Sequence, residues 1–338
     1  MRIGVLDVGS NTAHLLVADT SGGMPLPVRT AKTRLRLAER VGPDGMLDEA
    51  AIGRLSDAVS LAVAQAREMG VEELFGYATA TIRDAPNSQE ALSAVRHRAG
   101  VTLGVLSGIE EAELTYLAAR RWMGWRAGPL LVLDIGGGSV EVAYGRDVTA
   151  ELAVSLPLGA GRLTRERLPG DPPSTGQVKA LREYLREEFG GLAQRLRWAR
   201  PRTAVATSRT FHQLARLCGA PPPRRGPFVQ RLLHRKALGR QLPNLARLPT
   251  ADRARLPGIS AARAGQTLAG ALVAHTAMDL FDLRRVMVCP WALREGILLR
   301  RLESAVWWRE RSVDLGTLRP VPMPARTAVV PIGTARRR

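Results

Sequence analysis

Two short polar segments of this chain combine an aspartate with a glycine-rich bend. The first runs from Asp7 through Gly9 to Thr12, and the second runs from Asp134 through three glycines to Ser139. Glycine lets the backbone approach a ligand closely, and successive amide groups with neighbouring hydroxyls form an anion-binding pocket. A carboxylate beside such a pocket repels phosphate unless a cation such as Mg²⁺ lies between them. Taken singly, each bend is also compatible with an ordinary tight turn, whereas two matching bends indicate phosphate chemistry with a divalent cation.

A pair of glutamates belongs to a second chemical pattern, at the start of a predicted helix. Ser107 and Glu110 have the spacing of a capping box, in which each side chain satisfies a backbone donor of the other residue. Glu111 lies one residue further on, where the helix N-terminus favours an ionised carboxylate. Such a group can accept a proton from water that attacks phosphorus. The alternative is that Glu111 is a solvated surface acid.

The elements that must hold the bends are repeated along the chain. Apolar runs precede each bend at 3–8 and 130–135 and follow it at 14–18 and 140–144, so each bend joins two strands. Repeats of solenoid proteins are roughly 20–50 residues long. Because Asp7 and Asp134 are much further apart, the repetition predicts two duplicated lobes that face one another.

The other elements alternate between helix and strand. Asp48 can cap a helix in which apolar residues recur at helical spacing from Ile52 to Ala66. This alternation is typical of α/β proteins. The further expected elements are strands at 75–79 and 101–106, helices at 171–190 and 260–283, and broken helices and loops between 220 and 258, where seven prolines fall.

Length and composition indicate a globular protein. The 338 residues correspond to about two domains at roughly 150 residues each. The sequence is 45% hydrophobic and 24% charged, which is enough for a packed core. A cytoplasmic location is expected, because no apolar run reaches the ~18 residues of a membrane span and the first strand carries Asp7, unlike a signal peptide. The two cysteines cannot form a disulfide framework.

The net charge of +18 is concentrated in the second half of the chain. Residues 1–150 carry 15 basic and 18 acidic side chains, whereas residues 195–263 carry 16 basic side chains and one acid, Asp252. We expect this segment to attract a polyanion. A nucleic acid, a phosphate polymer and an acidic membrane surface are each compatible with it. Almost all the basic residues are arginines, so genomic base composition is an alternative cause.

Taken together, these segments resemble the exopolyphosphatase and guanosine pentaphosphate phosphatase family, from residue 1 to about residue 303. The resemblance implies an α/β fold of the actin-like ATPase superfamily, with two duplicated ribonuclease-H-like lobes at 1–127 and 128–303, an interlobe cleft, and a last helix that packs back on the first lobe. Residues 304–338 are expected to be a disordered basic tail. The segments that carry the resemblance are Asp7–Thr12, Ala78–Thr79 with Arg83 and Asn87, Ser107–Ala112, Asp134–Glu141, Pro157–Leu163, Ala206–Ser208 and Leu293–Gly296.

The resemblance also assigns roles to individual residues. Glu111 and Glu141 would be the catalytic acids, and Asp134, Asp7 and Glu141 would be linked to the metal. An alternative for Arg83 is an interlobe salt bridge. His14 stands where many relatives have arginine, so it either contacts phosphate or packs within the lobe. The phosphate-binding residues would be Ser10, Asn11, Thr12, Arg83, Gly136, Gly137, Gly138, Ser139, Thr207 and Ser208.

The activity implied is Mg²⁺-dependent hydrolysis of the terminal phosphoanhydride of inorganic polyphosphate, with K⁺ as a candidate activator. Guanosine pentaphosphate, or the tetraphosphate, is the alternative substrate. A kinase on the same fold and an arginine-rich nucleic-acid-binding module are the competing functions. We expect no membrane and no nucleic-acid partner, and a homodimer is a candidate assembly. The chain ends too soon after Arg301 to hold the helical C-terminal hydrolase domain of long relatives, so the basic residues of 195–263 are expected to hold the polymer instead.

Overall fold

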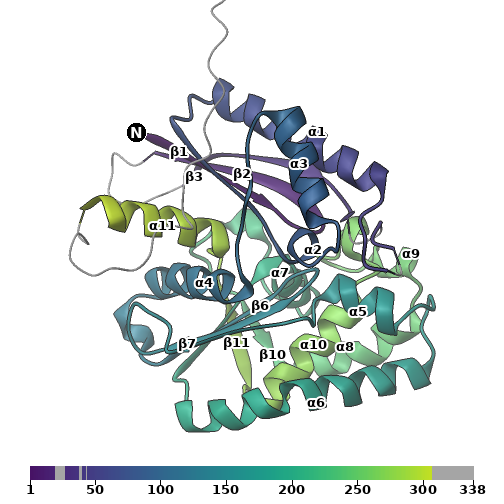
Figure 1. Cartoon of the computed structure of the whole chain (residues 1–338). Helices are drawn as coiled ribbons and strands as arrows, with labels where there is room; N and C mark the ends of the chain where they lie inside the picture. Colours follow the sequence, from purple (N-terminus) through teal and green to yellow (C-terminus); the bar gives the residue numbers. More distant parts are fainter. Residues whose placement is uncertain (20–26, 38–39, 43, 307–338) are drawn as a thin grey trace, which may run out of the picture.

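The two strand–bend–strand segments lie at the centres of two separate β-sheets, one in each half of the chain (Figure 1). The computed structural model describes residues 1–19, 27–37, 40–42 and 44–306, with side chains described to residue 303. The expected basic tail at 304–338 lies almost wholly outside the described residues. Among the described residues, no helix is both long enough and apolar enough to cross a membrane.

The first sheet has the strand order β3-β2-β1-β4-β5. β1, β2 and β3 pair antiparallel, whereas β4 and β5 join in parallel. In this register Asp7 lies opposite His14, and His14 lies opposite Lys32, so these three residues form a row across the sheet. The strands are β1 (Arg2–Val8), β2 (Thr12–Asp19), β3 (Pro27–Arg34), β4 (Glu73–Ala78) and β5 (Gly104–Val105).

The second sheet repeats this order, with β8-β7-β6-β9-β11 in the corresponding places and β10 added at the edge. Here Asp134 lies opposite Glu141 and Glu141 opposite Ser155, while Thr207 is the parallel neighbour of Asp134. The two sheets therefore share one strand order, in agreement with the predicted duplication. The strands are β6 (Leu130–Ile135), β7 (Val140–Gly145), β8 (Leu152–Leu156), β9 (Thr203–Thr207), β10 (Leu232–His234) and β11 (Arg285–Val288).

One pair of helices, α4 (Gly108–Met123) and α11 (Leu293–Val306), lies between the two sheets (Figure 1). Leu114 of α4 and Leu298 of α11 join a buried cluster with Val5 of the first sheet, and Tyr116 of α4 packs in a cluster with Val132 of the second. The last helix therefore contacts the first lobe.

Side chains alternate between the two faces of a strand. Asp7 accordingly shares a face with Val5, and Asp134 shares a face with Val132. Both aspartates point toward the layer formed by α4 and α11.

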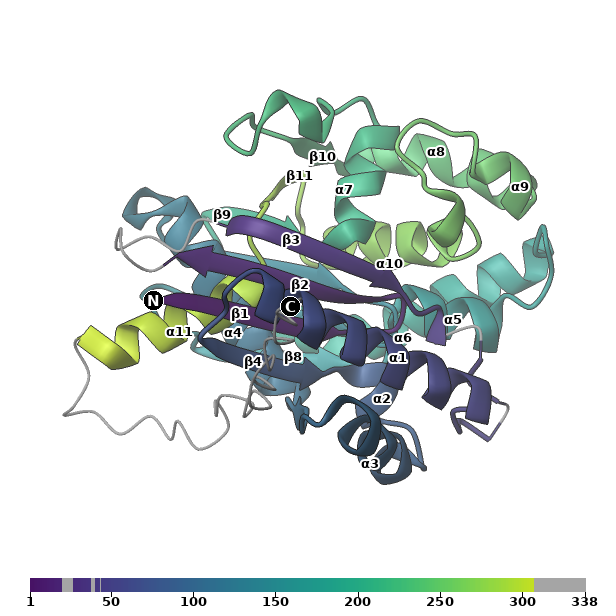
Figure 2. The same cartoon turned by 90° about the horizontal axis from the view of Figure 1, so that it is seen from above.

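The outer faces of the sheets are covered by the remaining helices (Figures 1 and 2). The predicted cap of α1 is confirmed, because Oδ1 of Asp48 accepts a hydrogen bond of 2.6 Å from the amide of Ala51. The first sheet is covered by α1 (Glu49–Glu68) and α3 (Ser88–Ala99), which lie next to the short α2 (Ala80–Arg83). The second sheet is covered by α5 (Ala160–Arg167), α6 (Thr175–Ala199), α7 (Ser208–Leu217), α8 (Arg235–Arg247) and α10 (Thr267–Leu280), which lie next to the short α9 (Thr250–Arg253).

The proline-rich stretch between 220 and 258 is more regular than predicted. It contains the edge strand β10, and α8 continues through Pro243 for thirteen residues in all. Pro243 lacks a backbone N–H and costs a helical hydrogen bond. Burial of Leu238, Leu242 and Leu245 against the lobe core offsets that cost.

Candidate active site

The two glycine bends meet at the interface between the lobes. A Cβ atom added to Gly137 would overlap Oγ of Ser10, and one added to Gly138 would lie 3.0 Å from Cβ of Ala80 in the first lobe. The absence of side chains at these two glycines therefore permits the close approach. The duplicated bends are brought together, as the prediction of facing lobes requires.

The second bend is held from behind by the start of α5. The amides of Gly159, Ala160 and Arg162 donate to the carbonyl oxygens of Gly138, Gly136 and Gly137 at 3.3, 3.0 and 2.9 Å. The bend carbonyls are thus occupied, whereas the amides of Gly137 and Gly138 donate to no acceptor among the described residues. Two N–H groups remain available to an anion.

The first bend is tied to the second lobe through its side chains. Nδ2 of Asn11 donates to Oγ of Ser10 at 3.0 Å, and Oδ1 of Asn11 accepts from Nε2 of Gln266 at 3.4 Å. Gly9 closes the turn by donating its amide to the carbonyl of Thr12 at 3.0 Å. Ser10, Asn11 and Thr12 therefore lie at the interlobe surface where phosphate donors were predicted.

Asp134, which is half-buried, and Glu141, which is buried, form a carboxylate pair on neighbouring strands. Burial raises the pKa of Asp134 to about 6, opposed by the hydrogen bond of 2.6 Å from Oγ1 of Thr207. Burial, and then the charge of Asp134, raise the pKa of Glu141 to about 7, opposed by hydrogen bonds from Ser139 and Ser155. Oγ of Ser155 lies 2.9 Å from Oε1 of Glu141. Both acids thus resist ionisation in the absence of a cation.

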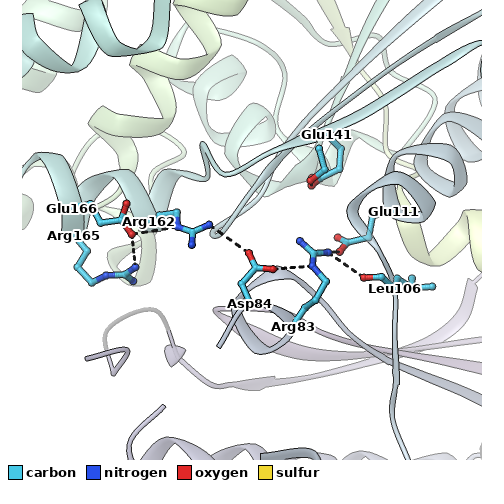
Figure 3. Close-up of polar contacts among 9 residues, drawn as sticks. Arg83, Asp84, Leu106, Glu111, Glu141, Arg162, Arg165 and Glu166 are labelled. Atoms are coloured by element: carbon cyan, nitrogen blue, oxygen red, sulfur yellow. Dashed lines mark hydrogen bonds and ion pairs between the residues drawn. The ribbon is translucent and has the colours of Figure 1, made fainter. Parts of the chain in front are cut away.

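Glu111 lies in the first turn of α4 and faces Glu141 (Figure 3). The capping box is confirmed, with the amide of Ser107 2.7 Å from Oε2 of Glu110. Glu111 is only 7% exposed, which excludes the alternative of a solvated surface acid. Its pKa is raised well above the usual value, chiefly by burial and then by Glu141, while Arg83 opposes the rise.

Asp7 is held by the last helix. Nη1 of Arg294, in the first turn of α11, lies 2.8 Å from Oδ2 of Asp7. The charge of Asp7 also raises the pKa values of Glu111 and Asp134, so these carboxylates are near enough to influence one another. His14, opposite Asp7, is 8% exposed, and burial followed by Arg294 lowers its pKa to about 2. It therefore packs within the lobe as a neutral ring.

Arg83 links Glu111 to a chain of ion pairs along the cleft (Figure 3). Its Nη1 lies 2.5 Å from Oε1 of Glu111, and its Nε lies 2.9 Å from Oδ1 of Asp84. Asp84, not Arg83, makes the interlobe bridge, at 3.5 Å to Nη1 of Arg162. Arg162 and Arg165 both contact Glu166. An interlobe pocket of about 550 Å³ beside Gly137 and Gly138 is lined by Asp84, Arg162, Arg165 and Glu166, but not by Arg83 or Glu111.

Thr207 and Ser208 lie at the end of β9 and the start of α7. Thr207 has no exposed surface, and its hydroxyl donates to Asp134. Its evident function is to position that carboxylate. Ser208 has a φ of 73°, a conformation that serine rarely adopts, and its buried hydroxyl lies close enough to Asp134 to oppose the rise in the pKa of that carboxyl. A phosphate contact by these two residues stays a prediction.

Sequence reasoning gave no role to Arg294, Ser155 or the Asp84–Arg162 pair. The segment Leu293–Gly296 was visible as family-like, but the sequence does not show that α11 returns to β1. The partnership of Ser155 with Glu141 depends on the register of β8, which no local pattern fixes.

Comparison with known proteins places this geometry in a family. The Ppx/GppA phosphatase family model matches residues 16–305. An uncharacterised protein of Streptomyces coelicolor is 56% identical over 329 residues, covering 96% of this chain and 98% of its own. Exopolyphosphatase 1 of Mycobacterium tuberculosis is 49% identical over 306 residues, covering 90% of this chain and 89% of its own. The crystal structure of an exopolyphosphatase from Cytophaga hutchinsonii shares the fold, with a TM-score of 0.82 at 24% identity over 90% of this chain and 98% of that one. The chain therefore belongs to the Ppx/GppA phosphatase family.

Proposed function

We propose that the protein is an exopolyphosphatase that hydrolyses the terminal phosphoanhydride of inorganic polyphosphate and releases orthophosphate. The observation that carries the proposal is the convergence of Glu111 and Glu141 beside the point where the two bends meet at Ser10 and Gly137. The match in identity and length to a mycobacterial exopolyphosphatase supports the same substrate class.

In the proposed reaction, the free amides of Gly137 and Gly138 bind oxygens of the terminal phosphoryl group. Glu111 accepts a proton from a water molecule, whose oxygen forms a new bond to phosphorus while the bridging P–O bond breaks. The products are orthophosphate and a chain one phosphate shorter. The raised pKa of Glu111 makes it a stronger base than an exposed carboxylate. Positioning and charge stabilisation supply most of the catalysis in phosphoryl transfer.

The residues present fit a magnesium ion. Mg²⁺ is usually held by one or two carboxylates together with substrate phosphates, and Asp134 and Glu141 supply two carboxylates whose repulsion a cation would relieve. No set of three metal-binding side chains converges within the described residues. The bound ion would neutralise charge on the phosphoryl group. Asp7 is held by Arg294 and would act on this site through its charge.

Guanosine pentaphosphate shares the terminal phosphoanhydride and is the alternative substrate. We favour polyphosphate because the basic excess of residues 195–263 suits a long polyanion better than a single nucleotide. The buried acids and paired bends have no use in a module that only binds nucleic acid. A cytoplasmic location, a homodimer and activation by K⁺ stay predictions.

The test is a panel of phosphate-release assays on the purified chain. With Mg²⁺ present, we expect rapid release of orthophosphate from polyphosphate, slower release from guanosine pentaphosphate, and loss of both activities when a chelator removes the ion. A chain that releases phosphate only from the nucleotide would reverse the choice of substrate. ATP formation from ADP without free phosphate would instead indicate a kinase.

The acid limb of the pH profile should depend on Ser155. Its hydrogen bond stabilises the charged form of Glu141, so Ser155→Ala should raise the pKa of Glu141 above its value of about 7. Since the proposed reaction needs this carboxylate ionised, the acid limb of kcat against pH should move upward by about one pH unit. Ser60→Ala, which removes a hydroxyl on α1, is the control. A profile unchanged by Ser155→Ala would show that this bond does not tune the reaction.

A further inference from the structure

Gly108 is the first residue of α4, and the proposed reaction gives it no role. Glycine is among the poorest helix formers, so alanine at this position would favour the helix. The backbone does not require glycine either, because φ of Gly108 is not positive. The reason for a glycine here must therefore lie in what surrounds it.

Gly108 lies against Ser155 of β8. A Cβ atom added to Gly108 would overlap both Cβ and Oγ of Ser155. Rotation about the Cα–Cβ bond of Ser155 could move Oγ aside, but Cβ is fixed to the backbone. A larger residue at Gly108 would therefore have to displace the backbone of α4 or of β8. The lack of a side chain permits this close approach of helix and strand.

Ser155 also holds Glu141, one of the two acids of the proposed reaction. Its Oγ donates a hydrogen bond of 2.9 Å to Oε1 of Glu141. The two residues lie directly opposite one another on β8 and β7, so their side chains share one face of the sheet. Any displacement of Ser155 would therefore move the donor that orients Glu141.

The other acid, Glu111, belongs to the same helical turn as Gly108. Residues three apart are neighbours on a helix, and the amide of Glu111 donates to the carbonyl of Ser107 at 3.0 Å, so this turn moves as a unit. Nη1 of Arg83 binds the turn from the first lobe, at 3.1 Å from the carbonyl oxygen of Leu106 and 2.5 Å from Oε1 of Glu111. Figure 3 shows Glu111 held in this way on the side that faces Glu141.

The rest of α4 is packed on the second sheet along the same face. Gly108, Ala112 and Tyr116 recur every four residues, which places them on one side of the helix. Ala112 and Tyr116 belong to one buried cluster with strands of the second sheet, and a Cβ added to Gly145 of β7 would lie 2.6 Å from Oη of Tyr116. Because these contacts hold the rest of the helix, a larger residue at Gly108 would displace chiefly the first turn, which carries Glu111.

We infer that the contact of Gly108 with Ser155 sets the separation of Glu111 from Glu141, so that Gly108 and Ser155 are positioning residues for the two acids. This inference rests on the proposed function and deepens it. The two acids come from α4 and β7, and the contact ties both to one point. It should act on turnover more than on binding, because the glycine bends proposed to hold the phosphate are not part of it.

The first test is the variant G108A. We expect kcat with polyphosphate to fall about tenfold, which is less than the ~10²-fold loss that a misplacement of 1 Å can cause. KM should stay nearly unchanged. The matched control is G176A, at the second residue of α6, a helix that begins with the same kind of capping box. A Cβ added there would lie 3.8 Å from Oγ of Ser174, an ordinary contact, so G176A should keep its turnover.

The second test is rescue from the other side of the contact. S155G removes both atoms that an alanine at position 108 would overlap, whereas S155A removes only Oγ. Residues in contact give non-additive effects. We therefore expect G108A/S155G to have the kcat of S155G alone, and G108A/S155A to have a lower kcat than S155A. If G108A does not fold, the comparison of G108A/S155G with S155G decides, and a lower kcat of the double variant would refute the inference.

The outcomes separate the positioning role from the function. If the unmodified chain hydrolyses polyphosphate and G108A keeps its kcat, or if G176A loses as much, the inference is wrong and the activity stands. An equal loss from G108A in the presence and absence of S155G would also refute it. If the unmodified chain releases no phosphate, the proposed function fails, and crystal structures of this chain and of G108A decide. A larger separation of Glu111 from Glu141 in G108A would support the inference, and an unchanged separation would refute it.

Discussion

Glu111→Gln should slow the release of orthophosphate from polyphosphate by about 10²–10⁴-fold, the usual contribution of a general base. Glutamine keeps the size of the side chain and an oxygen for Arg83, which lies 2.5 Å from Oε1 of Glu111, but it cannot accept the proton of the attacking water. Because burial already disfavours the ionised glutamate, the neutral amide should not destabilise the fold. The measurements are kcat with saturating polyphosphate and a thermal unfolding curve.

The adjacent residue provides a matched control for this variant. Glu110 belongs to the same helical turn, and glutamine is also accepted at its position in a capping box. Glu110→Gln should therefore retain nearly normal turnover. Turnover of Glu111→Gln within tenfold of the unmodified chain would remove Glu111 from the reaction.

Gly159→Ala should reduce turnover by about 10²-fold and lower the free energy of unfolding by about 1–3 kcal/mol. Gly159 has φ of −62° and ψ of 147°, which alanine adopts easily, so backbone strain is not the cause. The added Cβ would overlap backbone atoms of Gly137, Gly138 and Ser139. Main-chain atoms cannot move aside as a flexible side chain does, so the second bend and its free amides must shift.

A second glycine distinguishes this steric effect from the general effect of alanine. Gly190 lies inside α6, and a Cβ added there meets nothing within 4 Å. Gly190→Ala should raise the free energy of unfolding by about 0.5–1 kcal/mol, because alanine favours helix. Unfolding curves should show opposite changes in stability for the two variants, and phosphate-release assays should show lost turnover for Gly159→Ala only. A Gly159→Ala protein with normal turnover would show that the bend tolerates displacement.

Local patterns predicted the parts of the site that depend on neighbouring residues. The capping box of Ser107 and Glu110 and the cap of α1 by Asp48 each involve residues three apart, so their spacing is visible in the sequence. The apolar runs on either side of Asp7 and of Asp134 are also short-range patterns, and their repetition predicted two equivalent sheets. The resemblance to a family supplied the roles of Glu111 and Glu141, which composition and spacing alone left open.

Long-range partnerships were not predictable. The ion pair of Arg294 with Asp7 joins residues 287 positions apart, and nothing near either residue indicates the other. The hydrogen bond from Ser155 to Glu141 follows from strand register. Pro243 led to the wrong expectation of broken helices, because a proline disfavours helix through local backbone effects. The buried leucines that stabilise α8 do so by packing against the core, which the local sequence does not show.

The position of α11 in the chain has a consequence for biosynthesis. Arg294 lies near the end of the described residues, and its helix fills the layer between the two sheets. A ribosome-bound chain from which this helix has not yet emerged already contains both bends and Glu111. It still lacks Arg294, the cation that pairs with Asp7. Newly made protein should therefore begin to consume its substrate only once translation has passed this helix.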